Sequence, residues 1–411
     1  MDNDKRFVTG LDVGTENVRA VIVSVDKDNH LAVVGYNEGK SAGMRKGVPA
    51  NLAGPAGAID KMLGEAERMG GYDVRNAYVS INGSSILSTR TEGMIAVGTV
   101  EHEINVEDLD RVEDVAVSGR IPANRDVLDV VPLEYALDGQ GGIKDPLGMS
   151  GARLELRACV VSALTPNCDN LKKATAAADV HADRLVPSVV AAAKAVLTDR
   201  QRENGVAVID MGATTTSVAV YEEGDLQYVG VVPAGSNNIT NDLAIVLAID
   251  PTLAEEIKQR FITGDFDHEK SPVIKIGREG KDERAFDRKE VELVVKARLE
   301  EIFGEIRKKL KAAKYDQRLP EGIVLVGGGA KMRDIDLFAK KSLEAAVKIG
   351  VPTGLGGVAD AIEKPEFATA VGLAILAAIE GQYTPVKTKK AKKGQKTAKN
   401  GNFLTKLFSK F

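Results

Sequence analysis

The sequence predicts an α/β fold built from two related halves, because one pattern occurs twice in the chain. Residues 7–25 read FVTGLDVGTENVRAVIVSV, and residues 206–221 read VAVIDMGATTTSVAVY. Each segment is an apolar strand, then Asp-x-Gly with a threonine close behind, then a second apolar strand. The two aspartates, Asp12 and Asp210, lie about 200 positions apart. That separation is typical of a duplicated architecture and not of a short repeat array.

Turn signals extend each half into a meander of three antiparallel strands. After the first segment, DKDNH at 26–30 leads into LAVVGYN, and after the second, EEGD at 222–225 leads into LQYVGVV. Asp, Asn and Gly tolerate the backbone geometry of tight turns. Helical patterns follow each meander, and strands that alternate with helices indicate mostly parallel pairing beyond it.

Apolar residues at helical spacing predict most of the remaining elements. The expected helices cover residues 52–69, 169–180, 187–199, 251–261, 291–315 and 367–379. A buried strand at 322–326 precedes a further helix, which is expected after Arg333. Residues 85–165 break the alternation with short strands around one helical run at 106–118, which indicates a small inserted α+β subdomain.

Length and composition bound the class of protein. The 411 residues, 44% of them hydrophobic and 28% charged, suffice for about two to three soluble domains. No run of about 18 apolar residues predicts a membrane-spanning helix, and the N-terminus lacks the pattern of a signal peptide, so export is not expected. The two cysteines, Cys159 and Cys168, fit a reducing compartment, and the four histidines are not spaced as zinc ligands.

The formal net charge of −4 conceals an uneven distribution. Residues 382–411 contain nine lysines and no acidic residue, which leaves the preceding part of the chain strongly acidic. An acidic body argues against nucleic-acid binding by the folded part. The basic end is therefore interpreted as a segment that makes its own interactions, separate from those of the folded part.

The last ten residues, NFLTKLFSKF at 402–411, form an amphipathic pattern. The segment before them, 385–401, has no hydrophobic periodicity and is expected to be a basic, flexible linker. The apolar side chains fall on one face of a helix and the lysines on the other, and the expected membrane-binding residues are Phe403, Leu404, Lys406, Leu407, Phe408, Lys410 and Phe411. A disordered basic end and a helix for a protein partner are the alternatives. Lysines joined to a Phe/Leu face favour a reversible in-plane anchor on anionic lipid.

Each Asp-x-Gly turn has the composition of a phosphate site. A glycine between two strands lets backbone N–H groups converge into an anion-binding nest. The aspartate can hold a hydrated Mg²⁺, and the threonine hydroxyl can donate to a phosphate oxygen. A single copy is more often a plain turn, but two copies in matched strand contexts favour a function.

Two weaker signals lie later in the chain. A strand ends in three glycines, Gly327, Gly328 and Gly329, which let a ligand approach the backbone. A helix follows, and its N-terminus favours anions. A plain strand–helix turn is nevertheless the more ordinary explanation of this pattern. The spacing of a Rossmann motif is not met and no Walker A sequence is present, which disfavours a nicotinamide enzyme. Glu255 and Lys258 stand three apart on a charged helix and could reach a ribose and its base, although the spacing alone favours an ordinary solvated pair.

Two such hairpins about 200 residues apart, with a late glycine-rich strand–helix turn, resemble the actin-like ATPases. Within that group the chain is similar to the FtsA family of bacterial cell-division proteins. The most specific piece is VPLEYALDGQGGIKDPLGMSGARL at 131–154, which follows that family's extra subdomain. The resemblance covers nearly the whole chain. It implies a duplicated actin-like (ribonuclease H-like) core with an inserted α+β subdomain and a C-terminal amphipathic helix.

The resemblance also implies how the chain divides. In chain order the implied parts are a first core at 1–84 and 166–203, its FtsA-type insert at 85–165, a second core at 204–244 and 316–384, its insert at 245–315, the linker at 385–401 and the membrane-targeting helix at 402–411. In the family, the insert of the second core carries the site for the tubulin-like division protein FtsZ, although no spacing in this sequence marks its residues.

Carried over residue by residue, the resemblance implies a site for ATP and Mg²⁺. The implied nucleotide-binding residues are Asp12, Gly14 and Thr15 of the first phosphate loop, Asp210, Gly212 and Thr215 of the second, Glu255 and Lys258 of the nucleoside helix, and Gly327, Gly328 and Gly329 of the adenosine loop. Asp12 and Asp210 are implied as the residues that hold Mg²⁺, through water.

The second loop departs from the family pattern, which usually reads Asp-x-Gly-Gly-Gly-Thr-x-Asp. Ala213 and Thr214 replace two glycines, and Ser217 stands where the second aspartate would be. Fewer glycines narrow the approach of the backbone to a phosphate. The missing carboxylate removes a candidate for ordering the metal or the attacking water. We therefore expect nucleotide binding with at most weak ATPase activity, and no catalytic residue is nominated.

The function that the resemblance implies is a filament-forming membrane adaptor. Such a protein binds ATP, polymerises with copies of itself, contacts other division proteins and tethers FtsZ to the cytoplasmic face of the cell membrane at the division septum. One alternative is a sugar-type kinase on the same fold, which needs a carboxylate base that the sequence does not identify. The other is a pilus-assembly adaptor, against which the insert at 131–154 speaks.

Overall fold

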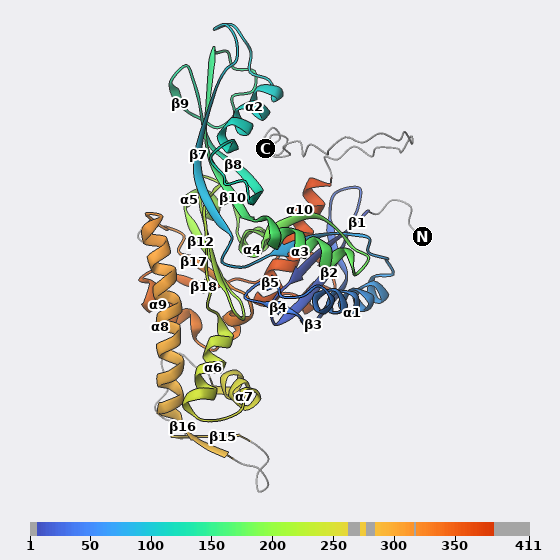
Figure 1. Cartoon of the computed structure of the whole chain (residues 1–411), viewed down its shortest axis with the longest axis vertical. Coiled ribbons are helices and arrows are strands. Elements are labelled where there is room, and N and C mark those ends of the chain that lie inside the picture. Colours follow the sequence, from blue (N-terminus) through green and yellow to red (C-terminus); the bar gives the residue numbers. More distant parts are fainter. Residues whose placement is uncertain (1–5, 262–271, 277–283, 316–317, 382–411) are drawn as a thin grey trace.

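Two α/β units, each centred on its own sheet, form the middle of the molecule, and smaller subdomains extend from it at both ends (Figure 1). The computed structural model describes residues 6–261, 272–276, 284–315 and 318–381. The predicted linker and membrane helix, 385–401 and 402–411, lie outside the described residues. Within the described ranges, no helix combines the length and the apolarity that crossing a bilayer requires.

The first sheet has six strands in the order β11-β6-β1-β2-β3-β19. Its strands are β1 (Arg6–Val13), β2 (Asn17–Val25), β3 (Leu31–Lys40), β6 (Asn76–Ile81), β11 (His181–Pro187) and β19 (Gly356–Gly357). The three strands of the predicted meander, β1, β2 and β3, pair antiparallel, and the others join in parallel. Helices α1 (Ala53–Gly70) and α3 (Thr165–Ala176) pack on one face and α10 (Ala368–Glu380) on the other. Helix α4 (Ser188–Val196) lies beside α10.

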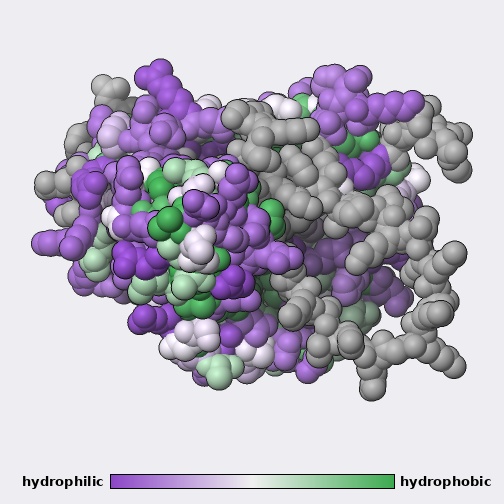
Figure 2. All heavy atoms as spheres, turned by 90° about the horizontal axis from the view of Figure 1, so that it is seen from above, coloured by the Kyte–Doolittle hydropathy of each residue, from purple (hydrophilic) through white to green (hydrophobic). Residues whose placement is uncertain are grey.

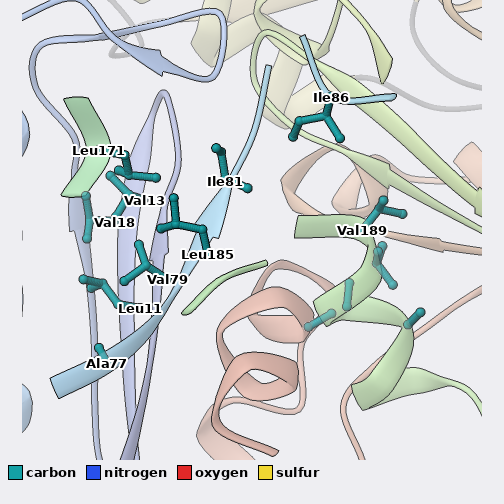
Figure 3. Close-up of a cluster of buried hydrophobic side chains, with 14 of the residues drawn as sticks. Leu11, Val13, Val18, Ala77, Val79, Ile81, Ile86, Leu171, Leu185 and Val189 are labelled. Carbon is teal, nitrogen blue, oxygen red and sulfur yellow. The ribbon is translucent and has the colours of Figure 1, made fainter. Parts of the chain in front are cut away.

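The long apolar run of β2 arises because both of its faces are buried. Val18 and Ile22 belong to the core against α1 and α3, and Figure 3 shows Val18 in that cluster together with Leu171 of α3. Val21 and Val23 face the other way and pack in the cluster that includes α10. A strand covered on both sides loses the polar alternation of a half-exposed strand.

The second sheet repeats the first, with five strands in the order β14-β13-β12-β17-β18. Its strands are β12 (Val206–Met211), β13 (Thr216–Glu222), β14 (Asp225–Val232), β17 (Ile323–Val326) and β18 (Val347–Ile349). Strands β12, β13 and β14 form an antiparallel meander, and β17 and β18 continue the sheet in parallel. The predicted pair of meanders is therefore confirmed in both halves.

A helical subdomain extends from the second sheet at the lower end of Figure 1. It comprises α6 (Ser236–Val246), α7 (Pro251–Phe261), β15 (Val273–Ile276), β16 (Arg284–Asp287) and α8 (Arg288–Ala312). Helix α7 has the predicted bounds. Helix α8 starts after Asp287, whose side chain accepts a hydrogen bond from the amide of Lys289 and so caps the first turn.

A four-stranded antiparallel sheet, in the order β7-β10-β8-β9, forms the opposite end of the molecule (Figure 1). This inserted subdomain comprises β7 (Leu87–Ala96), α2 (Val106–Val117), β8 (Arg125–Leu137), β9 (Gln140–Ile143) and β10 (Arg153–Leu164). It has its own core, in which Leu109 and Val112 of α2 pack with Leu154 and Leu156 of β10. Seen from this end, the molecule presents a mostly hydrophilic face on which hydrophobic residues gather in one area (Figure 2).

The remaining elements are short, and three helix predictions need correction. The short elements are β4 (Met44–Arg45), β5 (Val48–Pro49), α5 (Asp199–Asn204), α9 (Ile335–Leu343) and the 3₁₀ helices η1 (Gly328–Lys331), η2 (Ala359–Ala361) and η3 (Pro365–Phe367). Helix α3 begins before the predicted residue 169, because a proline fits the first turn of a helix. The helix predicted at 187–199 ends at Val196, and α5 starts anew with Thr198 as its cap. The helix predicted at 291–315 is α8, which begins at Arg288 and ends at Ala312, because Asp287 caps its first turn. The helix predicted after Arg333 is confirmed as α9, and the glycine run reaches it through η1.

Candidate functional site

A cavity of about 610 Å³ lies between the two halves, within the range of about 300–1,000 Å³ that is usual for small-molecule sites. All the residues that the sequence nominated for a nucleotide line it, namely Asp12, Gly14, Thr15, Asp210, Gly212, Thr215, Glu255, Lys258, Gly327, Gly328 and Gly329. The fold thus brings four separate motifs into one place. Their individual roles stay predictions.

The first loop is the turn between β1 and β2, and its geometry requires a glycine. The amide of Gly14 donates to the carbonyl of Asn17 at 3.1 Å, and a Cβ on Gly14 would lie 2.7 Å from that carbonyl oxygen. Ser80 holds Asp12 in place, because its hydroxyl donates to Oδ1 at 2.7 Å and accepts from the amide of Val13 at 2.9 Å. Burial raises the pKa of Asp12, and the charge of Arg19 opposes that rise.

The second loop connects β12 and β13 in the same way. The amide of Gly212 donates to the carbonyl of Thr215 at 2.9 Å, which closes the turn. Burial raises the pKa of Asp210 to about 6, and the nearby charge of Asp12 adds to the rise. Both carboxyl groups line the same cavity, and carboxylate oxygens are the ligands that Mg²⁺ prefers. Asp12 and Asp210 therefore fit the predicted water-mediated Mg²⁺.

The two loops touch each other across the cavity. Thr214 donates its hydroxyl to Oγ1 of Thr15 at 2.9 Å, and the amide of Gly47 donates to the same oxygen at 3.0 Å. Asn237, at the start of α6, donates to the carboxylate of Glu16 at 3.0 Å. Hydroxyl and amide groups from both halves therefore converge at one end of the cavity.

Helix α7 places Glu255 and Lys258 on the cavity wall. Lys258 is only 6% exposed, forms an ion pair with Glu255 and donates to Oγ1 of Thr240 at 2.9 Å. Burial lowers the pKa of Lys258, and the pairing with Glu255 opposes that effect. The alternative of an ordinary solvated pair is therefore wrong for Lys258, which the fold holds inside.

The glycine run lies where β17 ends beside β12. Gly327 has φ 86°, in the left-handed region, and a Cβ there would collide with Oδ1 of Asp210. A Cβ on Gly329 would overlap the side chain of Met211, whereas one on Gly328 would meet nothing within 4 Å. Only glycine lets this turn pass so close to the second loop.

Sequence reasoning missed several residues that line the same cavity. These are Glu16, Asn17, Arg19, Glu38, Lys40, Gly47, Asn82, Ser236, Asn237, Gln259, Lys331, Met332, Arg333, Glu366 and Thr369. One signal was available for Arg19, because a charged residue inside the apolar run of β2 is unusual and needs a partner. Nearness to a predicted motif was a second signal, available for Glu16, Asn17, Gln259, Lys331, Met332 and Arg333. The rest come from elements that are distant in sequence from those motifs, and their placement depends on the fold.

Comparisons with known proteins identify the family. A family model described as "Cell division protein FtsA" matches residues 207–372, and one described as "SHS2 domain inserted in FTSA" matches residues 83–162. The cell division protein FtsA of Pseudomonas aeruginosa is 33% identical over 374 residues, which are 90% of this chain and 88% of that protein. The chain belongs to the FtsA family. FtsA of Escherichia coli is 31% identical over 90% of both proteins, and FtsA of Bacillus subtilis is 32% identical over 91% of this chain and 83% of its own length.

Solved structures resemble the chain in fold. The PilM-PilN type IV pilus biogenesis complex contains a chain that matches 90% of this one and 98% of its own length, with a TM-score of 0.67 and 18% identity. MreB5 of Spiroplasma citri, bound to ADP, matches 92% of this chain and 99% of its own, with a TM-score of 0.53 and 15% identity. The predicted fold class, an actin-like duplicated core with the FtsA insert, is thereby confirmed for the described residues. This FtsA-family chain is an actin-like cell-division protein.

Proposed function

We propose that the cavity binds ATP with Mg²⁺ and that this ligand favours the conformation in which the protein polymerises. The convergence of both Asp-x-Gly turns, the glycine turn and the buried Lys258 on one cavity carries the proposal. The solved structures of MreB5 bound to ADP and to AMPPNP, which share the fold, support a nucleotide as the ligand. A ligand shifts a conformational equilibrium only as far as it binds one state better than the other.

The proposed roles of the residues follow from their chemistry. When bound, Mg²⁺ neutralises phosphate charge, and Asp12 and Asp210 would hold it through water. Thr15 and Thr215 line the cavity, and their hydroxyls would donate to the phosphates. Lys258, which Thr240 holds in place, would contact the nucleoside.

The site favours binding over turnover. Ser217, which takes the place of an aspartate in the family pattern, is 4% exposed and is not among the residues that line the cavity. A serine there supplies no carboxylate to orient an attacking water. We therefore propose a weak ATPase in which the nucleotide acts mainly as a conformational ligand.

We further propose that the protein works at the cytoplasmic face of the cell membrane, at the division septum. Residues 402–411 would lie in the membrane surface, with the Phe/Leu face in lipid and the lysines at anionic headgroups. One short anchor is reversible, and polymerisation would add many anchors into a stable attachment. The filament would tether FtsZ and so link the division ring to the membrane. Membership of the FtsA family supports this role.

Co-sedimentation with liposomes tests the proposal. The full chain should pellet with anionic vesicles, more completely with ATP and Mg²⁺ than without, and recruit FtsZ to the pellet. Two controls are a chain truncated after Pro385 and a full chain with Leu404→Ser and Phe408→Ser, which keeps every lysine. Both controls should remain in the supernatant. The adaptor function is contradicted if the full-length protein stays in the supernatant with ATP, or if it pellets without recruiting FtsZ. Phosphorylation of a sugar by the protein would favour the kinase alternative.

A further inference from the structure

The cavity wall contains a buried guanidinium that none of the four proposed nucleotide motifs includes. Arg19 lies in the middle of β2, directly across the ladder from Asp12 on β1 and from Glu38 on β3. It is 8% exposed, and its guanidinium carbon lies 5.8 Å from the ring centroid of Phe367. Three charged side chains on neighbouring strands therefore form one row at the base of the cavity, with the cation in the centre.

The hydrogen-bonding capacity of Arg19 is only partly used. Its Nη2 donates to Oε1 of Glu38 at 2.6 Å, whereas Nη1 lies 3.7 Å from Oδ2 of Asp12, an ion pair that is too long for a hydrogen bond. Among the described residues, its buried Nε has no hydrogen-bond partner. Buried polar groups are almost always satisfied, so this guanidinium has hydrogen-bonding capacity beyond its bond to Glu38.

The charged residues on the cavity wall are not evenly paired, and the excess of carboxylates lies near Arg19. Three lysines on its wall each pair with one carboxylate, Lys40 with Glu16, Lys258 with Glu255 and Lys331 with Glu366. Arg19 instead stands between two carboxylates, and the ion pairs of the described ranges include none for Asp210. The first-loop end of the cavity therefore holds more negative than positive charge, and that excess repels phosphate.

We propose that Arg19 is a positioning residue that acts as a built-in counter-ion for Asp12 and shares this carboxylate with the hydrated Mg²⁺. The inference rests on the proposed nucleotide function and deepens it. With Mg²⁺ bound, the metal and Arg19 together balance Asp12 and Asp210. When Mg²⁺ is scarce, Arg19 still offsets part of the negative charge of Asp12 and so weakens the repulsion that a nucleoside diphosphate meets. Nucleotide binding then depends on Mg²⁺ less steeply than it would without the guanidinium.

Calorimetric titration of ADP into the full-length chain, in saturating Mg²⁺ and in excess EDTA, tests this role. The variant Arg19→Met keeps an apolar stem beside Phe367 and removes the charge. We expect its affinity to fall at least about tenfold in EDTA and by less than about threefold in Mg²⁺. Arg19→Lys, which restores the charge, should recover most of the loss in EDTA.

The outcomes separate this inference from the function on which it rests. Wild-type protein that binds no ADP in either buffer overturns the proposed function and this inference with it. If the wild type binds and Arg19→Met loses the same factor in both buffers, or loses nothing in EDTA, Arg19 is structural and only the inference fails. If circular dichroism shows that Arg19→Met does not fold, the same ADP titrations on Glu38→Gln test the role of Arg19 instead. It keeps an acceptor for Nη2, removes a competing charge and should tighten binding in EDTA about threefold; unchanged or weaker binding there contradicts the proposal.

Discussion

Asp210 shows at the scale of one residue how a binding site opposes stability. Its pKa in the native protein is about 6, against about 3.9 for an unfolded aspartate, and burial is the main cause. The native state therefore binds the proton more tightly, so this carboxyl favours folding most below about pH 4 and loses that contribution as the pH rises through 6. The ionised carboxylate of Asp210 therefore lowers the free energy of unfolding at neutral pH.

We expect Asp210→Asn to raise the free energy of unfolding by up to about 3 kcal/mol at pH 7.5 and by roughly half as much at pH 5. Urea titrations at the two pH values measure this difference. Asp26→Asn is the control, because Asp26 lies on an exposed turn and hydrogen bonds from His30 lower its pKa. A gain for Asp210→Asn that is equal at both pH values would show that ionisation is not its source.

Residues also mark the limit of what the sequence predicts about the site. The two Asp-x-Gly turns and the glycine run were predictable, because each is a local pattern at the end of a strand. The contact of Thr15 with Thr214 was not, since it joins residues 199 positions apart across the cavity. The pairing of Arg19 with Glu38 depends on the register between β2 and β3, which no local pattern states.

At the scale of elements, the inserted sheet is fastened to the second half and not only to the first, in which it is inserted. Ser88 on β7 accepts from the amide of Val229 at 2.9 Å and donates to its carbonyl, which links β7 to β14. Lys144, which follows β9, donates to the carboxylate of Asp225 at 2.8 Å, at the start of β14. The family-specific segment at 131–154 thus contributes the side chain of Lys144 to the contact between the insert and the second half.

Removing Lys144 should weaken this attachment. Asp225 is 8% exposed, so Lys144→Met leaves a largely buried carboxylate without its partner, and we expect the free energy of unfolding to fall by about 1 kcal/mol. Arg157→Met is the matched control, because it removes the exposed pair with Glu134 within the insert and should cost less than about 0.5 kcal/mol. Guanidinium titrations compare the two. If Asp225→Asn does not reduce the cost of Lys144→Met, the ion pair is not the cause.

At the scale of the whole molecule, helices α4 and α10 join the two halves, and the first turn of α10 reaches the cavity through Thr369. Helix α10 packs on the first sheet, and α4 lies between α10 and strands β12 and β13 of the second sheet. The two helices approach so closely that a Cβ on Gly372 of α10 would overlap the carbonyl of Ala191 in α4. A shift in the spacing of this pair should therefore change how far apart the two Asp-x-Gly turns stand.

Gly372→Ala should change both stability and ligand binding through this one contact. Inserting a methyl group where two backbones touch forces the helices apart, and we expect a loss of about 1–3 kcal/mol in the free energy of unfolding. Gly304→Ala is the control, because a Cβ on Gly304 in α8 would meet nothing within 4 Å, and alanine there should stabilise the helix by up to about 1 kcal/mol. Opposite signs from the same substitution would assign the loss to the crossing of α4 and α10. If the crossing of α4 and α10 positions both phosphate loops, Gly372→Ala should also weaken ADP binding severalfold in calorimetry, while Gly304→Ala leaves the affinity unchanged. Equal ADP affinities for the two variants would mean that the loops are positioned independently of the helix pair.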